Sequence, residues 1–94
     1  LRGLEFPWIN SIKSMTGHCI GAAGAIESVA SILQLNGGFM HKNLNCQNIH
    51  PDIESIIDQR RIVRETRYQK LNCIVKANFG FGDINSCLVF KSAN

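Results

Sequence analysis

The sequence predicts a small α/β unit, and three observations lead to this prediction. An aromatic and β-branched run at residues 6–12 is typical of a strand. Apolar residues at helical spacing follow over residues 18–35. Two further strand-like runs, at residues 71–77 and 86–90, close the sequence with a short glycine-containing turn between them. Strand, helix and two closing strands in this order favour an α/β arrangement.

The first strand and the helix are expected to meet in a tight turn over residues 13–17. Thr16 is predicted to be the N-cap, because its hydroxyl can accept a hydrogen bond from a backbone N–H of the first turn. One helix face is apolar and the others carry small residues, which predicts burial on several sides. Residues 36–38, Asn-Gly-Gly, should end the helix. The apolar face consists of Ile26, Val29, Ala30 and Leu33.

The stretch from residue 39 to residue 69 is predicted to be mainly loop, because asparagines and a His-Pro pair interrupt it. Residues 52–58 could form a helical turn within it. The turn at residues 80–83 is so short that the last two strands should be antiparallel neighbours.

The composition fits one small folded domain, with 94 residues of which 45% are hydrophobic and 18% charged. No apolar run is long enough to span a membrane, so no membrane partner is expected. The four cysteines form no CxxC pair, which argues against a zinc ribbon. Cys73 and Cys87 lie in strand-like runs and are expected to be buried thiols in a cytoplasmic protein. Because Leu1 leads directly into a buried-looking run, we interpret the chain as a C-terminal piece of a longer protein.

The net charge of +3 is partly local, since five basic residues surround the single acid Glu65. Two interpretations remain open: a solvated surface, or a docking patch for an acidic protein partner. A nucleic-acid partner is not expected, because Tyr68 is the only aromatic residue that could stack there and no nucleic-acid motif surrounds it. The basic residues are Arg60, Arg61, Arg64, Arg67 and Lys70.

Residues 13–24, Lys-Ser-Met-Thr-Gly-His-Cys-Ile-Gly-Ala-Ala-Gly, carry the main candidates for chemistry. Lys13 and His18 lie five residues apart in a turn that leads into the helix. A helix N-terminus disfavours the imidazolium form, and a neutral imidazole can donate a hydrogen bond to a developing oxyanion. The glycine spacing does not match a dinucleotide-binding motif. With the segment Asn-Phe-Gly-Phe-Gly at residues 78–82, this stretch resembles the Lys/His segment and Gly-Phe-Gly loop of the β-ketoacyl-acyl carrier protein synthases, in the order in which that family has them.

This resemblance implies that residues 1–94 form the closing βαββ part of the C-terminal half of a thiolase-like fold. It implies decarboxylative Claisen condensation of an acyl thioester with malonyl-acyl carrier protein, in fatty acid or polyketide synthesis, without metal or organic cofactor. The implied partners are acyl carrier protein, malonyl and acyl thioesters, the remainder of the same synthase and a second copy in a homodimer. The alternatives are a non-catalytic chain-length-factor-like subunit and a coenzyme A-using enzyme. His18 and Lys13 argue against both.

The resemblance also implies roles for single residues. His18 would bind the thioester carbonyl of the malonyl group while carbon dioxide leaves. Lys13 would act as a fixed cation beside it. Phe81 would gate the acyl pocket and contribute its backbone N–H to an oxyanion hole, with Gly80 and Gly82 shaping the loop.

Three further residues are expected to support this site. Glu27 would belong to a polar network behind it, which in some family members surrounds a bound cation. Lys76 stands in the family's cation-binding stretch, so its ammonium is expected to replace the cation and pair with Glu27. Asn85 retains its family position, although Asp83 replaces a glycine before it. The nucleophilic cysteine and a second histidine of the family are absent, so the chain alone should be inactive.

Overall fold

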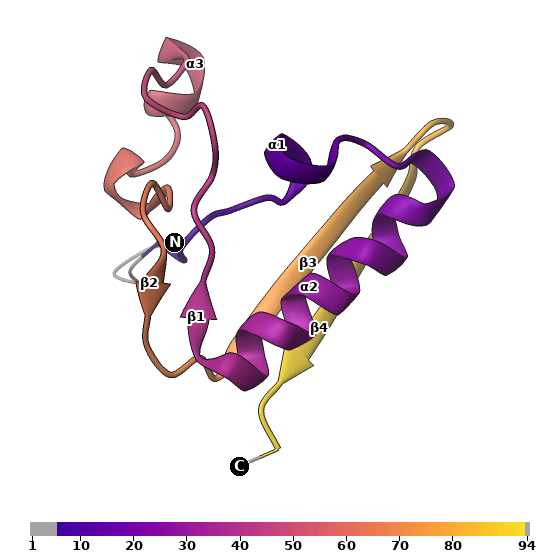
Figure 1. The fold of residues 1–94 in the computed structure, drawn as a ribbon. Coiled ribbons are helices and arrows are strands. Elements are labelled where there is room, and N and C mark those ends of the chain that lie inside the picture. Colours follow the sequence, from indigo (N-terminus) through magenta and orange to yellow (C-terminus); the bar gives the residue numbers. More distant parts are fainter. Residues whose placement is uncertain (1–5, 94) are drawn as a thin grey trace.

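The computed structural model describes residues 6–93 and places one long helix on a β-hairpin (Figure 1). The helix is α2 (Ala23–Gly37), and it packs against β3 (Cys73–Gly80) and β4 (Ile84–Lys91). Two very short strands, β1 (Phe39–Met40) and β2 (Arg67–Tyr68), form a separate antiparallel pair. The predicted α/β class is therefore confirmed.

The long connection between α2 and β3 is mainly loop, as predicted. Apart from β1 and β2, it holds two single turns of helix, α3 (Pro51–Glu54) and η2 (Gln59–Arg61). The side chain of His50 caps α3, because its Nδ1 accepts a hydrogen bond from Asp52 N at 3.1 Å. A helical turn is thus present in this region, but it is shorter than residues 52–58.

The strand predicted at residues 6–12 is not formed. Only Ile9 takes part in a bridge, which is parallel to Ile62. Ile9 N donates to Arg61 O at 2.8 Å, and Val63 N donates to Ile9 O at 3.1 Å. A strand needs a neighbouring backbone along its whole length, and within residues 6–93 only Ile9 has one.

The segment before α2 also differs from the prediction. Residues Lys13–Thr16 form a separate helical turn, α1, which ends at Gly17 with a φ of 75°. The chain then enters a 3₁₀ turn, η1 (Ile20–Ala22), which leads into α2. Thr16 is therefore not an N-cap, and its hydroxyl instead donates to Ile12 O at 3.2 Å. The break at Gly17 separates Thr16 from the N–H groups of α2 that it was expected to cap.

The predicted helix stop and hairpin are both present. Gly38 adopts a left-handed φ of 67°, and its N–H donates to Gln34 O at 2.9 Å, which ends α2. The strands β3 and β4 pair antiparallel, with Lys76 opposite Leu88. At the tip, Gly82 has a φ of 78° and Asp83 a φ of 60°. Glycine adopts a positive φ without steric cost, so Gly82 suits a tight turn.

Burial is more limited than predicted. The buried apolar residues are Ala23, Met40, Ile62 and Val63. The expected apolar face of α2 is largely exposed, with Val29 at 57% and Leu33 at 59%. Its other side, which carries Glu27, faces β3. The prediction of burial on several sides is thus wrong for the described residues, because only one layer covers the helix.

The two strand cysteines are exposed, so the prediction that they are buried thiols is also wrong. Side chains alternate between the faces of a strand. Lys76 faces α2, which directs Cys73 and Ala77 to the opposite, uncovered face. Cys87 lies opposite Ala77 in the antiparallel register and shares that face. All four cysteines are free.

Candidate functional site

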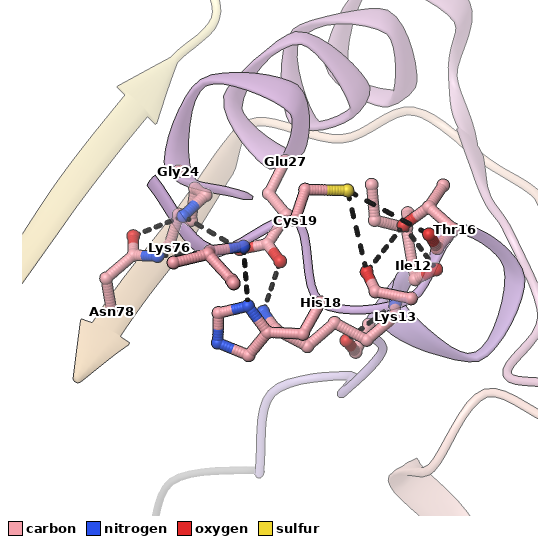
Figure 2. Close-up of polar contacts among 12 residues, drawn as sticks. Ile12, Lys13, Thr16, His18, Cys19, Gly24, Glu27, Lys76 and Asn78 are labelled. Atoms are coloured by element: carbon pink, nitrogen blue, oxygen red, sulfur yellow. Dashed lines mark hydrogen bonds and ion pairs between the residues drawn. The ribbon is translucent and has the colours of Figure 1, made fainter. Parts of the chain in front are cut away.

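Glu27 is the centre of a charged cluster that joins α1, α2 and β3 (Figure 2). Lys13 Nζ binds Glu27 Oε2, and Lys76 Nζ lies 3.1 Å from Glu27 Oε1. The Lys76 ammonium also donates to Asn78 Oδ1. Asn78 Nδ2 in turn lies 3.5 Å from Glu27 Oε1. The ion pair between Glu27 and Lys76 is the one that the sequence predicted.

The cluster is charged and mostly buried. The side chains of Lys76 and Glu27 are only 7% and 14% exposed, whereas that of Lys13 is 39% exposed. Burial raises the pKa of the Glu27 carboxyl, but the hydrogen bonds and charges of Lys13 and Lys76 outweigh this effect, so the pKa lies below its ordinary value. Two ammonium groups and one carboxylate leave a net positive charge beside α1.

The same contacts show why a metal ion does not fit here. Both carboxylate oxygens of Glu27 and the amide oxygen of Asn78 are bound to ammonium groups. A hard cation needs several such oxygens free. Elsewhere in residues 6–93, no group of three or more His, Cys, Asp or Glu side chains could hold a metal ion.

His18 lies in the exposed segment between α1 and η1. The backbone N–H of Ile20 donates to His18 Nδ1 at 2.9 Å. A backbone N–H can only donate, so Nδ1 is unprotonated and the proton of the neutral ring is on Nε2. The imidazole thus presents an N–H donor to the outside of the molecule.

The bond to His18 depends on an unusual backbone conformation of Ile20. This residue has a φ of 52°, in the left-handed region that β-branched residues rarely adopt. Its side chain is 84% exposed and thus gains little from packing. Strain of this kind persists where the surrounding structure imposes it, and it is frequent at functional sites. The strained residue therefore supplies the N–H that orients the histidine.

Replacing Ile20 with glycine should stabilise the protein by about 1 kcal/mol, because glycine adopts a positive φ without the steric cost, which outweighs the added chain entropy of the unfolded state. The backbone N–H remains, so the orientation of His18 should be kept. Chemical denaturation of both proteins measures the difference. A loss of stability would show that the Ile20 conformation is not strained. Ala25→Gly, at an exposed position of α2 with negative φ, is the control and should destabilise by about 1 kcal/mol.

The hairpin tip carries the other predicted residues. The side chain of Phe81 is fully exposed, at 101%, and contacts neither His18 nor Lys13. Gly80 ends β3, and Gly82 adopts its positive φ in the turn. Asn85 lies on β4 opposite Phe79 and is exposed. The tip lies at the same end of the hairpin as the start of α2 (Figure 1).

The structure thus unites Lys13, Glu27 and Lys76, while His18 and Phe81 stay outside this cluster. Sequence reasoning missed the part played by Asn78. Its position two residues after Lys76 on one strand puts both side chains on the same face, which is a signal that could have indicated it. The residue type of Ile20 does not indicate that its backbone N–H orients His18.

The chain is similar to a family model and to several known proteins. Residues 2–47 match the family model described as "Beta-ketoacyl synthase, C-terminal domain". The chain is 39% identical to 3-oxoacyl-[acyl-carrier-protein] synthase I of Hordeum vulgare over 87% of its own length and 17% of the relative's. It is 38% identical to synthase 1 of Haemophilus influenzae over 98% of its length, which covers 22% of that protein.

Synthase 1 of Escherichia coli is 35% identical over 95% of the chain and 21% of its own length. The chain therefore spans about a fifth of the length of these relatives. The matched stretches include both the Lys/His segment and nearly all of the described fold. By these matches the chain belongs to the β-ketoacyl synthase family, and its residues 2–47 correspond to that family's C-terminal domain.

Proposed function

We propose that this chain is part of a β-ketoacyl-acyl carrier protein synthase, an acyltransferase that elongates acyl thioesters in fatty acid or polyketide synthesis. The reaction is the decarboxylative condensation of an acyl thioester with malonyl-acyl carrier protein. One observation carries the proposal: the hydrogen bond from Ile20 N–H to His18 Nδ1, which leaves an outward-facing Nε2–H donor. The relatives are named as 3-oxoacyl-[acyl-carrier-protein] synthases, which supports the same activity.

His18 provides the chemistry that this reaction needs. Loss of carbon dioxide from a malonyl thioester leaves an enolate, whose negative charge is on the thioester oxygen. A fixed donor aimed at that oxygen stabilises the transition state without reorganising. The His18 Nε2–H is such a donor. Lys13 adds a positive charge at the start of the same segment, and Glu27 holds its ammonium in place.

Lys76 and Asn78 contact Glu27, which in turn binds Lys13. The Lys76 ammonium lies between β3 and α2, where the resemblance implies a bound cation in some family members, and together with Lys13 it favours the ionised form of Glu27. Glu27 then directs its second oxygen to Lys13. The role of Lys76 is therefore to position Lys13, and no metal or organic cofactor is required. Asn85 supports the hairpin near its tip.

The nucleophile comes from the rest of the synthase. Cys19 is half-buried, and its thiol lies 3.9 Å from the carbonyl oxygens of both Thr16 and Gly17. Among residues 6–93, its hydrogen bonds go only to these backbone carbonyls and not to a side chain that could act as a base. The other cysteines lie in a loop and on the hairpin. We therefore infer that the 94 residues do not catalyse the condensation by themselves.

Residues 1–94 would form the C-terminal portion of a thiolase-like domain and provide its closing βαββ part. In that arrangement residues 6–12 become a full strand, and further synthase strands cover the exposed apolar face of α2. The apolar side chains there, among them Val29 and Leu33, agree with such an interface. The partners are the acyl carrier protein, malonyl and acyl thioesters, and a second copy in a homodimer.

A cytoplasmic location also stays a prediction. None of the helices in residues 6–93 is both long and apolar enough to cross a membrane. The relative from Hordeum vulgare is named as chloroplastic. The non-catalytic alternative is not favoured, because the relatives named above are synthases.

The activity is tested with the full-length protein, acyl-acyl carrier protein and malonyl-acyl carrier protein. We expect release of carbon dioxide together with a carrier-bound 3-oxoacyl product that is two carbons longer, detected by mass spectrometry. Release of neither would overturn the proposed function. The same result would support the non-catalytic, chain-length-factor-like alternative.

Replacing Phe81 with alanine should change acyl-chain handling while leaving stability within about 0.5 kcal/mol, because the side chain is fully exposed. Product lengths from a mixture of acyl carriers, together with the thermal unfolding midpoint, measure both effects. Phe79→Ala, at an 81% exposed position on β3, is the matched control. An unchanged product profile in Phe81→Ala would show that the loop is only a hairpin turn.

A further inference from the structure

Regular strand pairing near the site stops at the bridge between Ile9 and Ile62, which are parallel neighbours. In a parallel ladder the evenly spaced bonds continue two residues further along the strand. The next bond in this register would run from Ser11 N to Val63 O. Ser11 N donates instead to a side chain, at 2.8 Å from Asn43 Oδ1.

The carboxamide of Asn43 fills the place of that ladder bond. Its Oδ1 accepts from Ser11 N, and its Nδ2 donates to Val63 O at 2.9 Å and to Ile9 O at 3.2 Å. An asparagine side chain can do this because it carries an acceptor and two donors. The backbone N–H of Asn43 also donates to Val63 O, at 2.9 Å. The two segments are therefore held one amide group apart.

The same loop also holds the start of α1. Leu44 N donates to Ser14 Oγ at 3.0 Å. Within the segment, Lys13 N donates to Ser11 Oγ at 3.2 Å. Lys13 thus stands between two residues, Ser11 and Ser14, that are each bound to this loop. From there its side chain reaches Glu27 on α2.

We propose that Asn43 is a positioning residue of the site, which sets the place of Lys13 by holding the segment before α1. This inference rests on the proposed function, in which the Lys13 ammonium is a fixed cation, and adds the residue that fixes its backbone. Glu27 holds the side chain of Lys13, and Asn43 holds the chain from which it extends. A charge stabilises a transition state best when it needs no reorganisation, so a loosened backbone lowers the rate.

A double-mutant cycle with Lys13 tests this role in the full-length protein. Asn43→Ala should lower kcat for decarboxylation of malonyl-acyl carrier protein about tenfold, within the range of coupling for residues in one network. In a Lys13→Met background, which already lacks the ammonium, the same change should cost less than about twofold. Asn48→Ala, at an exposed position in the same loop, is the control and should change neither background. An equal loss in both backgrounds, or no loss in either, would overturn the proposal.

The reactivity of the Lys13 amine tests the same inference without any measurement of turnover. The ion pair with Glu27 favours the ammonium, whereas reductive methylation requires the neutral amine. Asn43→Ala should therefore speed the methylation of Lys13, followed by peptide mass spectrometry, while that of Lys91 on β4 stays the same. Faster methylation of Lys13 supports the proposal even if the wild type condenses nothing. An unchanged rate would overturn it, even in an active synthase.

Ser14→Ala decides the matter if Asn43→Ala does not fold. Ser14 is exposed, and this change removes the acceptor of the bond from Leu44 N. It should lower decarboxylation and speed methylation of Lys13 by a smaller factor, about twofold, as expected for one hydrogen bond. Unchanged values of both would then count against a role of this loop in placing Lys13.

Discussion

Replacing His18 with alanine in the full-length protein is expected to abolish decarboxylation of malonyl-acyl carrier protein. The variant loses the Nε2–H donor that the Ile20 N–H bond leaves facing outward. Removing one such donor costs about 100- to 1,000-fold in rate. Acyl transfer to the cysteine should survive at least in part, since another group performs it. Carbon dioxide release and acyl-enzyme formation, followed in separate assays, measure the two steps.

A matched histidine variant separates catalysis from folding. His41→Ala removes a histidine whose ring makes a polar contact with the Lys42 carbonyl oxygen, at 3.1 Å, and it should leave both steps unchanged. His18→Gln retains an N–H donor at a similar reach from the backbone, on a more flexible side chain, and should lose less than His18→Ala. Wild-type condensation by His18→Ala would contradict the assignment of this residue as the oxyanion donor.

The second large effect is expected from Lys76. Lys76→Ala should lower the free energy of unfolding by about 3 kcal/mol, because the variant removes one partner of a buried ion pair. This is the lower end of the usual range, since Lys13 continues to pair with Glu27. Urea denaturation of the full-length protein measures the change. Activity should fall as well, because Glu27 loses the contact with Lys76 that fixes its orientation toward Lys13.

Lys76→Met separates the lost charge from the lost volume. Its side chain fills most of the same space, so a similar destabilisation in both variants would assign the effect to the ammonium group. Lys91→Ala, on the exposed end of the same hairpin, is the control and should change stability by less than about 0.5 kcal/mol. A stable Lys76→Ala protein that gains activity from added metal ions would contradict the proposed role.

The pH dependence of this pair has a defined direction. The pKa of Glu27 is lowered in the folded protein from its ordinary value of 4.5. A carboxyl group whose pKa is lowered by folding stabilises the folded protein at pH values above its pKa in the unfolded state. This stabilisation is lost as the pH falls through its pKa in the folded state. The difference in stability between wild type and Lys76→Met should therefore shrink below about pH 4.5. A stability difference that does not change with pH would mean that Lys76 does not stabilise the protein through Glu27.

The sequence alone determined the features that depend on neighbouring residues. Gly38 and Gly82 tolerate the left-handed backbone that ends α2 and turns the hairpin. The ion pair between Lys76 and Glu27 was expected from the resemblance, because Lys76 stands in the family's cation-binding stretch, and alternation along β3 allows its side chain to face Glu27. The start of the helix was predicted less closely, because His18 was expected at its N-terminus and α2 begins only at Ala23.

Only the tertiary structure decided the features that depend on contacts between distant segments. Residues 6–12 have strand-like composition, yet they form a single bridge because most of their length has no neighbour in the described chain. Cys73 and Cys87 are exposed because one face of the hairpin is uncovered. Trp8 meets Arg61 and Arg67 across more than fifty residues of chain. Propensity and periodicity report what a segment favours, but pairing and burial require a second surface whose position the local sequence does not encode.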